Sequence, residues 1–187
     1  MRMQARDLAA MIVAAAASLS LGPMAALASM TAAVGDLTFG TIAYAHEQQV
    51  RNGTLTLTAT DTGLGGLGMT NTGWNVTLLS SDFAYVGPNG GTPIPAGNLA
   101  VSAAGQPTAV SGQPISATGG PRTTGASGSL NVARKTLQAD GPSGIVVMTY
   151  YGIGTYSQPI DVSLVVPGQT RAGTYTATLT VTISAGP

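Results

Sequence analysis

The aromatic side chains are the residues of this sequence that are best suited to contact another molecule. Tyr150 and Tyr151 stand together before a glycine, and Tyr156 follows shortly after them. Tyrosines among glycines are typical of binding surfaces, because the rings supply rigid contact area and the glycines let the backbone adapt. Trp74 has two interpretations: a stacking platform for sugar rings, or a core residue of a strand with apolar neighbours at alternate positions. The candidate binding residues are therefore Trp74, Tyr150, Tyr151 and Tyr156.

Side chains that perform acid–base or nucleophilic chemistry are scarce. His46 is the only histidine and the chain has no cysteine, so a serine triad would have to use His46 as its base. Its neighbours contain no nucleophile motif, and it has no second histidine or cysteine with which to hold zinc. The acidic residues are scattered singly, which favours no pair for glycoside hydrolysis and no calcium loop. We therefore predict a surface histidine and a protein that is not an enzyme, with no catalytic residue, metal or cofactor.

A glycine-rich stretch over residues 63–68 formally fits the dinucleotide-binding pattern G-x-G-x-x-G. That pattern binds phosphate where it opens a helix, whose N-terminal amides hold the pyrophosphate. Here the next element, over residues 72–76, has the pattern of a strand. The stretch is better explained as a flexible connection.

The charge content excludes one class of partner. Charged residues are 7% of the chain, against about 25% in an average protein. Binding of nucleic acid needs a stripe of lysines and arginines that neutralise phosphates, and the sequence contains none. We expect no nucleic-acid partner.

Residues 1–28 have the layout of a secretory signal peptide. Arg2 and Arg6 begin it, an apolar run extends over residues 8–21, and Ala26-Leu27-Ala28 supplies a small-x-small cleavage pattern. The run is shorter than the roughly 20 residues that a membrane-spanning helix needs. We expect the general secretory route, cleavage after Ala28, an extracellular or cell-surface location and no membrane span after cleavage. The alternative is that the segment is retained as an anchor.

Residues 29–187 show the period of two that is typical of strands. In residues 174–184, threonines alternate with Tyr175, Ala177, Leu179 and further apolar residues. Residues 104–129, rich in Gly, Ser, Thr and Pro, predict long loops. Many short strands separated by turns predict a single domain, an all-β antiparallel β-sandwich. The other strands are expected at residues 54–60, 74–78, 145–151 and 160–166, with weaker ones at 37–43, 99–103 and 130–133.

The order of these features resembles the WxL domain of bacterial cell-surface proteins. The residues that carry the resemblance are 37–39, 57–62, Gly73-Trp74-Asn75-Val76, 94–99 and Tyr175-x-x-x-Leu179 with the ending to Pro187. The chain departs from the family at Val76, where the first motif has Leu, and at residues 181–183, where the family often has Trp-x-Leu. It thus looks like a divergent member.

The resemblance implies a fold and a function. Trp74, Val76, Tyr175 and Leu179 are the family-motif positions and are expected in the core. The function implied is non-covalent association with the cell envelope, with peptidoglycan or another cell-wall polymer as the ligand. The alternative is a structural subunit of a surface layer or fibre, which assembles with other surface proteins by pairing of edge strands.

Overall fold

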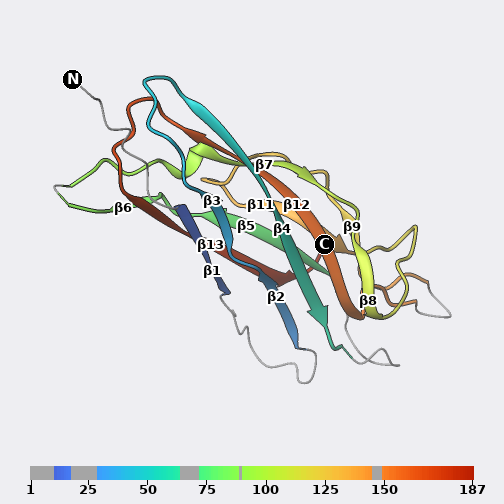
Figure 1. Cartoon of the computed structure of the whole chain (residues 1–187). Helices are drawn as coiled ribbons and strands as arrows, with labels where there is room; N and C mark the ends of the chain where they lie inside the picture. Colours follow the sequence, from blue (N-terminus) through green and yellow to red (C-terminus); the bar gives the residue numbers. More distant parts are fainter. Residues whose placement is uncertain (1–10, 18–28, 64–71, 89, 145–148) are drawn as a thin grey trace, which may run out of the picture.

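The computed structural model of the chain describes residues 11–17, 29–63, 72–88, 90–144 and 149–187. Within these residues the chain forms β-strands and one short 3-10 turn, Ala96–Asn98. The strands make two sheets that pack face to face, so the prediction of an all-β sandwich is confirmed (Figure 1). The described part contains no helix of the length and apolarity that crossing a membrane requires.

The first sheet contains the strands at the two ends of the described chain. Its order is β3 (Leu37–Gly40), β1 (Met11–Ala17), β13 (Thr174–Ala185), β5 (Trp74–Ser80), β11 (Arg134–Ala139) and β9 (Arg122–Thr123), with β6 (Ala84–Val86) also paired to β13.

The second sheet is built around the two longest strands. Its order is β10 (Gly128–Ser129), β7 (Leu99–Ala104), β12 (Gly154–Val166), β4 (Gln49–Asp61) and β2 (Met30–Val34), with β8 (Thr108–Gly112) also paired to β12. β4 and β12 pair along their whole length, from Gly154 opposite Asp61 to Val166 opposite Gln49.

Alternation along each strand builds the core between the sheets. On β13, Tyr175, Ala177 and Leu179 are buried, while the threonines between them lie on the outer face. β13 pairs antiparallel with β5, which sets Ile183 opposite Val76. The two sequence regions that resemble the WxL motifs are therefore neighbouring strands of one sheet, although most of the chain separates them.

Two predictions about strands are wrong, and a third lies mostly outside the described residues. Residues 104–129 contain the short strands β8, β9 and β10 instead of loops alone. The strand expected at 130–133 is a turn, whose Leu130 is nevertheless buried, and the strand follows it as β11. Of the strand expected at 145–151, residues 145–148 lie outside the described residues, and Tyr150 and Tyr151 belong to no strand.

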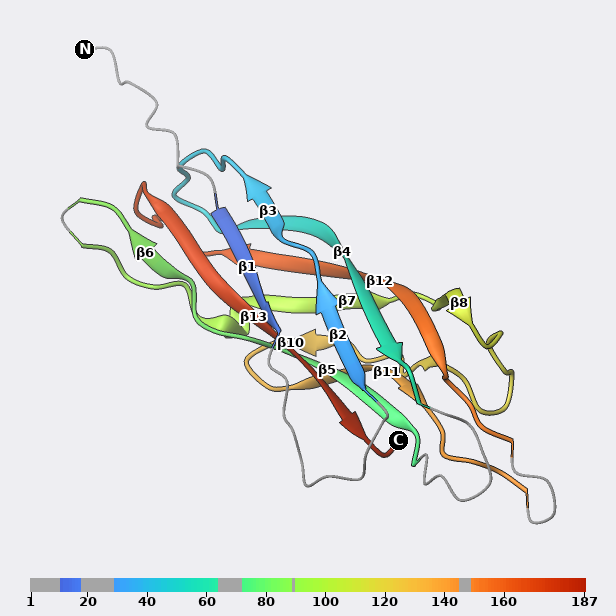
Figure 2. The ribbon, with the colours of Figure 1, turned by 90° about the horizontal axis from the view of Figure 1, so that it is seen from below.

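The apolar run of the predicted signal peptide contributes β1. β1 lies between β3 and β13 (Figure 2). It pairs parallel to β13, with Met11 opposite Tyr175 and Ala17 opposite Val181, and antiparallel to β3. Residues 1–10 and 18–28 of the predicted signal peptide lie outside the described residues.

Candidate functional site

Two of the four candidate binding residues belong to the core. Trp74 and Tyr156 are both fully buried, and their ring centroids are 6.2 Å apart. The Trp74 indole N–H donates to the Gly152 carbonyl at 3.1 Å. For Trp74 the core interpretation is confirmed, and its role as a stacking platform is wrong. The expectation that Tyr156 joins an exposed patch is also wrong, because β12 begins at Gly154 and turns Tyr156 inward.

The remaining family-motif positions are buried as expected. Val76, Tyr175 and Leu179 each have an exposed fraction of 1% or less. Burial raises the pKa of Tyr175, whose hydroxyl donates to the Arg171 carbonyl at 3.0 Å. These three residues therefore contribute to the core beneath the paired strands β5 and β13.

Tyr150 and Tyr151 lie in the loop before β12, and both are half-buried. The Tyr151 ring packs against the backbone of Gly119 so closely that a Cβ there would lie 2.1 Å from the ring's Cγ. Its hydroxyl is 2.7 Å from the Ser143 Oγ. Hydrogen bonds from Ser143 and then Thr118 lower the pKa of Tyr151. Tyr151 is thus fixed at the ring and at the hydroxyl while part of it faces solvent.

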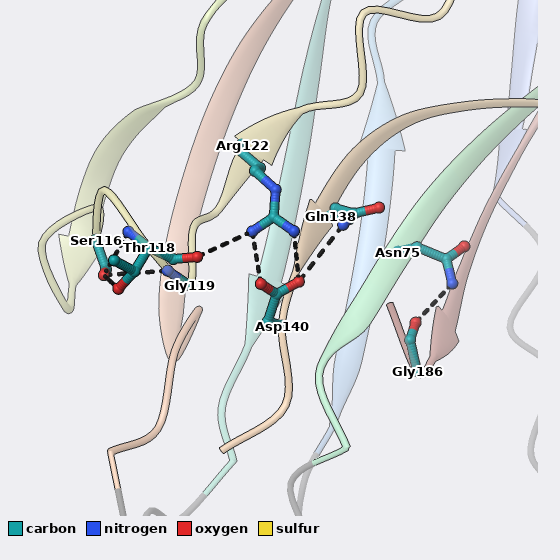
Figure 3. A network of polar contacts seen from close by, with 8 residues as sticks. All are labelled: Asn75, Ser116, Thr118, Gly119, Arg122, Gln138, Asp140 and Gly186. Carbon is teal, nitrogen blue, oxygen red and sulfur yellow. Dashed lines mark hydrogen bonds and ion pairs between the residues drawn. The ribbon is translucent and has the colours of Figure 1, made fainter. Parts of the chain in front are cut away.

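A doubly hydrogen-bonded ion pair stands close to this tyrosine. The two terminal nitrogens of Arg122 each donate to one carboxylate oxygen of Asp140, both at 2.7 Å. Gln138 donates to the same carboxylate at 3.4 Å. Arg122 lowers the pKa of Asp140, and Asp140 raises the pKa of Arg122. Figure 3 shows the three side chains on one face of the sheet.

The register of β9 and β11 explains this arrangement. Arg122 pairs with Gln138, and Asp140 follows Gln138 on the same face, which makes Arg122 and Asp140 a diagonal cross-strand pair. Leu137 and Ala139 point to the other face and are buried. The core therefore sets the position of the ion pair.

The loop that holds Gly119 is ordered by its own hydrogen bonds. Ser116 Oγ accepts from the backbone N–H groups of Thr118 and Gly119, both at 3.2 Å, and the Gly119 carbonyl accepts from the Asp140 N–H at 2.9 Å. Figure 3 shows this loop beside the ion pair. Gly119 is therefore tied both to its own loop and to the end of β11.

We define the Tyr151 surface as Gly119, Arg122, Gln138, Asp140 and Tyr151. It offers a fixed aromatic ring beside a planar pair of opposite charges. Because the charges are paired, it suits a neutral polar ligand, such as a sugar with its apolar ring face and hydroxyl groups, more than a polyanion. Its parts hold each other in place, so binding would order few side chains.

Sequence reasoning missed most of this surface. Arg122, Gln138 and Asp140 lie on or next to strands that were not predicted, and no motif links Arg122 to Asp140. The one available signal was the pair of adjacent tyrosines beside glycine.

Within the described part of the chain, the other side chains that could perform acid–base chemistry or bind a metal do not form a site. His46 is exposed, as predicted, and its ring meets Tyr44 edge-on at 5.4 Å between centroids. Among the described residues, no three side chains of His, Asp or Glu gather as a metal site would require. The glycine-rich stretch lies outside the described residues except for Gly63. A cavity at the far end of β12, beside Val166, has a volume of about 10 Å³, the size of one water molecule.

Asp61 is the buried carboxylate of the described chain, with an exposed fraction of 3%. Its carboxylate accepts from the Gly63 N–H at 2.8 Å, but burial has the larger effect and raises its pKa. A carboxyl whose pKa is raised by folding stabilises the fold below its unfolded pKa, and this contribution is lost as the pH rises through the folded pKa. The ionised Asp61 is therefore unfavourable at neutral pH.

Asp61→Asn is expected to raise the free energy of unfolding at neutral pH, because the amide keeps an acceptor oxygen and carries no charge. The gain should shrink as the pH falls below the ordinary value of 3.8. Urea unfolding at neutral pH and at a pH below 3.8 measures the change in the free energy of unfolding, with the exposed Glu47→Gln as control. A destabilisation at neutral pH that fades at low pH would show that the bond from Gly63 to the ionised carboxylate outweighs the effect of burial, and an equal change at both pH values would show that the charge of Asp61 has no net effect on stability.

No protein-family model matches the chain, and no curated protein sequence matches it either.

Proposed function

We propose that the chain is an exported, non-catalytic cell-surface protein that binds envelope polymer non-covalently through the Tyr151 surface. The observation that carries this proposal is the Tyr151 ring, seated on Gly119 and held at its hydroxyl by Ser143. A ring that is fixed and still partly exposed loses little conformational freedom when a ligand stacks on it.

The chemistry of the surface favours a saccharide polymer such as peptidoglycan. Arg122, Asp140 and Gln138 offer hydrogen-bond donors and acceptors next to the ring with no net charge from the ion pair. The whole chain is formally neutral, so attraction to a polyanion has no general source. The signal-peptide layout and the resemblance to WxL domains support the same location and ligand class.

Retention on isolated peptidoglycan tests the proposal. Secreted protein is mixed with washed, insoluble peptidoglycan and sedimented, and the bound fraction is measured over a concentration series. Tyr151→Ala is expected to weaken retention about tenfold or more, as the loss of an aromatic anchor typically does. Tyr151→Phe keeps the ring and loses only the hydrogen bonds of the hydroxyl, with Ser143 and Thr118, so we expect a smaller loss.

Tyr44→Ala is the matched control, because Tyr44 is 44% exposed and lies outside the Tyr151 surface. Its retention should equal that of the unchanged protein. Thermal unfolding of every variant separates lost binding from lost fold. Wild-type retention no greater than that of an unrelated neutral protein, or full retention by Tyr151→Ala, contradicts the proposal.

A further inference from the structure

The position of β1 in the first sheet indicates a second binding site, separate from the Tyr151 surface. β1 is the only strand that pairs with β3 and the only one on its side of β13 within the described residues. Cleavage after Ala28 would remove β1 from the mature chain. The sheet would then contain a slot between β3 and β13, which we name the β1 slot.

Backbone groups of β13 are directed into the β1 slot. The Thr178 N–H donates to Ser81 Oγ and the Thr178 carbonyl accepts from the Ser81 N–H, both at 2.9 Å, so the backbone of Thr178 faces β5. Successive residues of a strand point these groups to opposite sides, which turns the groups of Ala177 and Leu179 toward β1. Both residues are buried. This burial is that of the chain with β1 in place, and without a strand in the slot their N–H and carbonyl groups would form an open sheet edge, which is a template for the addition of another strand.

The side chains around the slot define what can fill it. Tyr175, Ala177, Leu179 and Val181 present a continuous buried apolar row along β13. The native occupant runs parallel to β13 and spans Met11–Ala17, a sequence of aliphatic residues without charge. A replacement must therefore be an extended, uncharged segment of similar length, with apolar residues at the positions aligned with this row, where β1 has Met11, Val13, Ala15 and Ala17.

We propose that the β1 slot of the mature protein binds an apolar strand of a partner polypeptide, added parallel to β13. A second copy is the weaker donor, because after cleavage every named strand of the described chain except β3 still pairs within its own sheet, and the first of them, β2, pairs with β4. β3 borders the slot itself and has 4 residues, against the 7 of β1. Addition of a strand to an open sheet edge is a common mode of peptide recognition. The inference rests on the export part of the proposed function and is independent of polymer binding.

The absence of cysteine from the chain allows a test by disulfide cross-linking. Ala14 of β1 pairs with the exposed Thr178 of β13. Paired strands lie about 4.8 Å apart, within the range that a disulfide bridges. In the full chain, Ala14→Cys with Thr178→Cys should form an intramolecular disulfide, whereas Ala14→Cys with Thr108→Cys on β8 should not. No disulfide in the first pair would overturn the placement of β1 and the proposal with it.

The mature protein carrying Thr178→Cys is then given a peptide of the Met11–Ala17 sequence with Cys at the Ala14 position and lysines outside it for solubility. We expect it to cross-link at least tenfold faster than a peptide with Pro at the Val13 position, which breaks strand pairing. We also expect it to react at least tenfold faster with Thr178→Cys than with Thr108→Cys. The uncleaved chain, whose slot is filled, should react slowly.

Each other outcome decides the question. If the mature chain folds and shows no preference between the two peptides, the proposal is wrong. If it does not fold alone, recovery of a cooperative thermal transition on adding the first peptide supports the slot, and no recovery refutes it. N-terminal sequencing of the secreted protein that finds residues 1–28 still attached also refutes it. Failure to bind peptidoglycan with efficient cross-linking would refute only the polymer proposal.

Discussion

Trp74→Ala is expected to lower the free energy of unfolding by about 3–5 kcal/mol, the usual cost of removing a large buried ring. The indole is fully buried, packs close to Gly152 and lies beside the Tyr156 ring. Its removal also leaves the Gly152 carbonyl without its donor, which adds about 1 kcal/mol. Because a domain is stable by only about 5–15 kcal/mol, a large part of the stability would be lost.

Urea unfolding followed by circular dichroism measures this change, since Trp74 is the only tryptophan and its fluorescence is lost with it. Trp74→Phe should cost less, because it keeps most of the packing. The exposed Tyr44→Ala should change stability by less than about 0.5 kcal/mol. A loss below about 1 kcal/mol for Trp74→Ala would mean that the ring is not part of the core.

Gly73→Ala, immediately before Trp74, is expected to cost about 3 kcal/mol or more. Gly73 has a φ of +76°, and a Cβ there would lie 2.4 Å from the Ala139 carbonyl oxygen and 2.6 Å from the Asp140 carbonyl carbon. These are backbone atoms of β11 and the residue after it, so no side chain can rotate away to make room. The substitution should push β5 and β11 apart where the sheet carries Trp74.

Gly125→Ala is the matched control for this prediction. Gly125 has a similar φ of +66°, but a Cβ there would meet nothing within 4 Å. Gly125→Ala should cost only about 1 kcal/mol, the free energy of placing a residue with a Cβ in the left-handed conformation. Thermal and urea unfolding of the two variants therefore isolate the effect of the contact with β11. Equal losses would show that the strands can separate at Gly73 without strain.

The predictable part of the fold comes from strands with one buried face. β13 alternates between apolar and polar residues along its length, and β5 does so from Trp74 to Leu78, and both were predicted close to their observed bounds. β11 begins with Arg134 and Lys135, which hide its alternation, and it was missed. The wrong placement of Tyr156 in an exposed patch has a similar cause. Glycine usually ends strands, but here Gly154 is the first residue of β12, so Tyr156 belongs to the strand and not to the loop before it.

The candidate site was less predictable, because a sheet register assembles it. Tyr151 was named from its neighbours, but the Gly119 seat that holds its ring lies far from it in the sequence. Arg122 and Asp140 meet only because Arg122 pairs with Gln138. Pairing between short strands depends on the whole fold, and local propensity does not encode it. The parallel placement of β1 beside β13 is a long-range feature of the same kind.

Amide chemical shifts during titration with soluble peptidoglycan fragments test the central claim most directly, since they report where on the molecule the polymer binds. With the secreted, ¹⁵N-labelled protein, binding at the Tyr151 surface predicts saturable shifts at Gly119, Arg122, Gln138, Asp140 and Tyr151. The amides of Tyr44 and His46, outside that surface, should not move. Shifts that cluster around His46, or no shifts at saturating fragment, would contradict the claim.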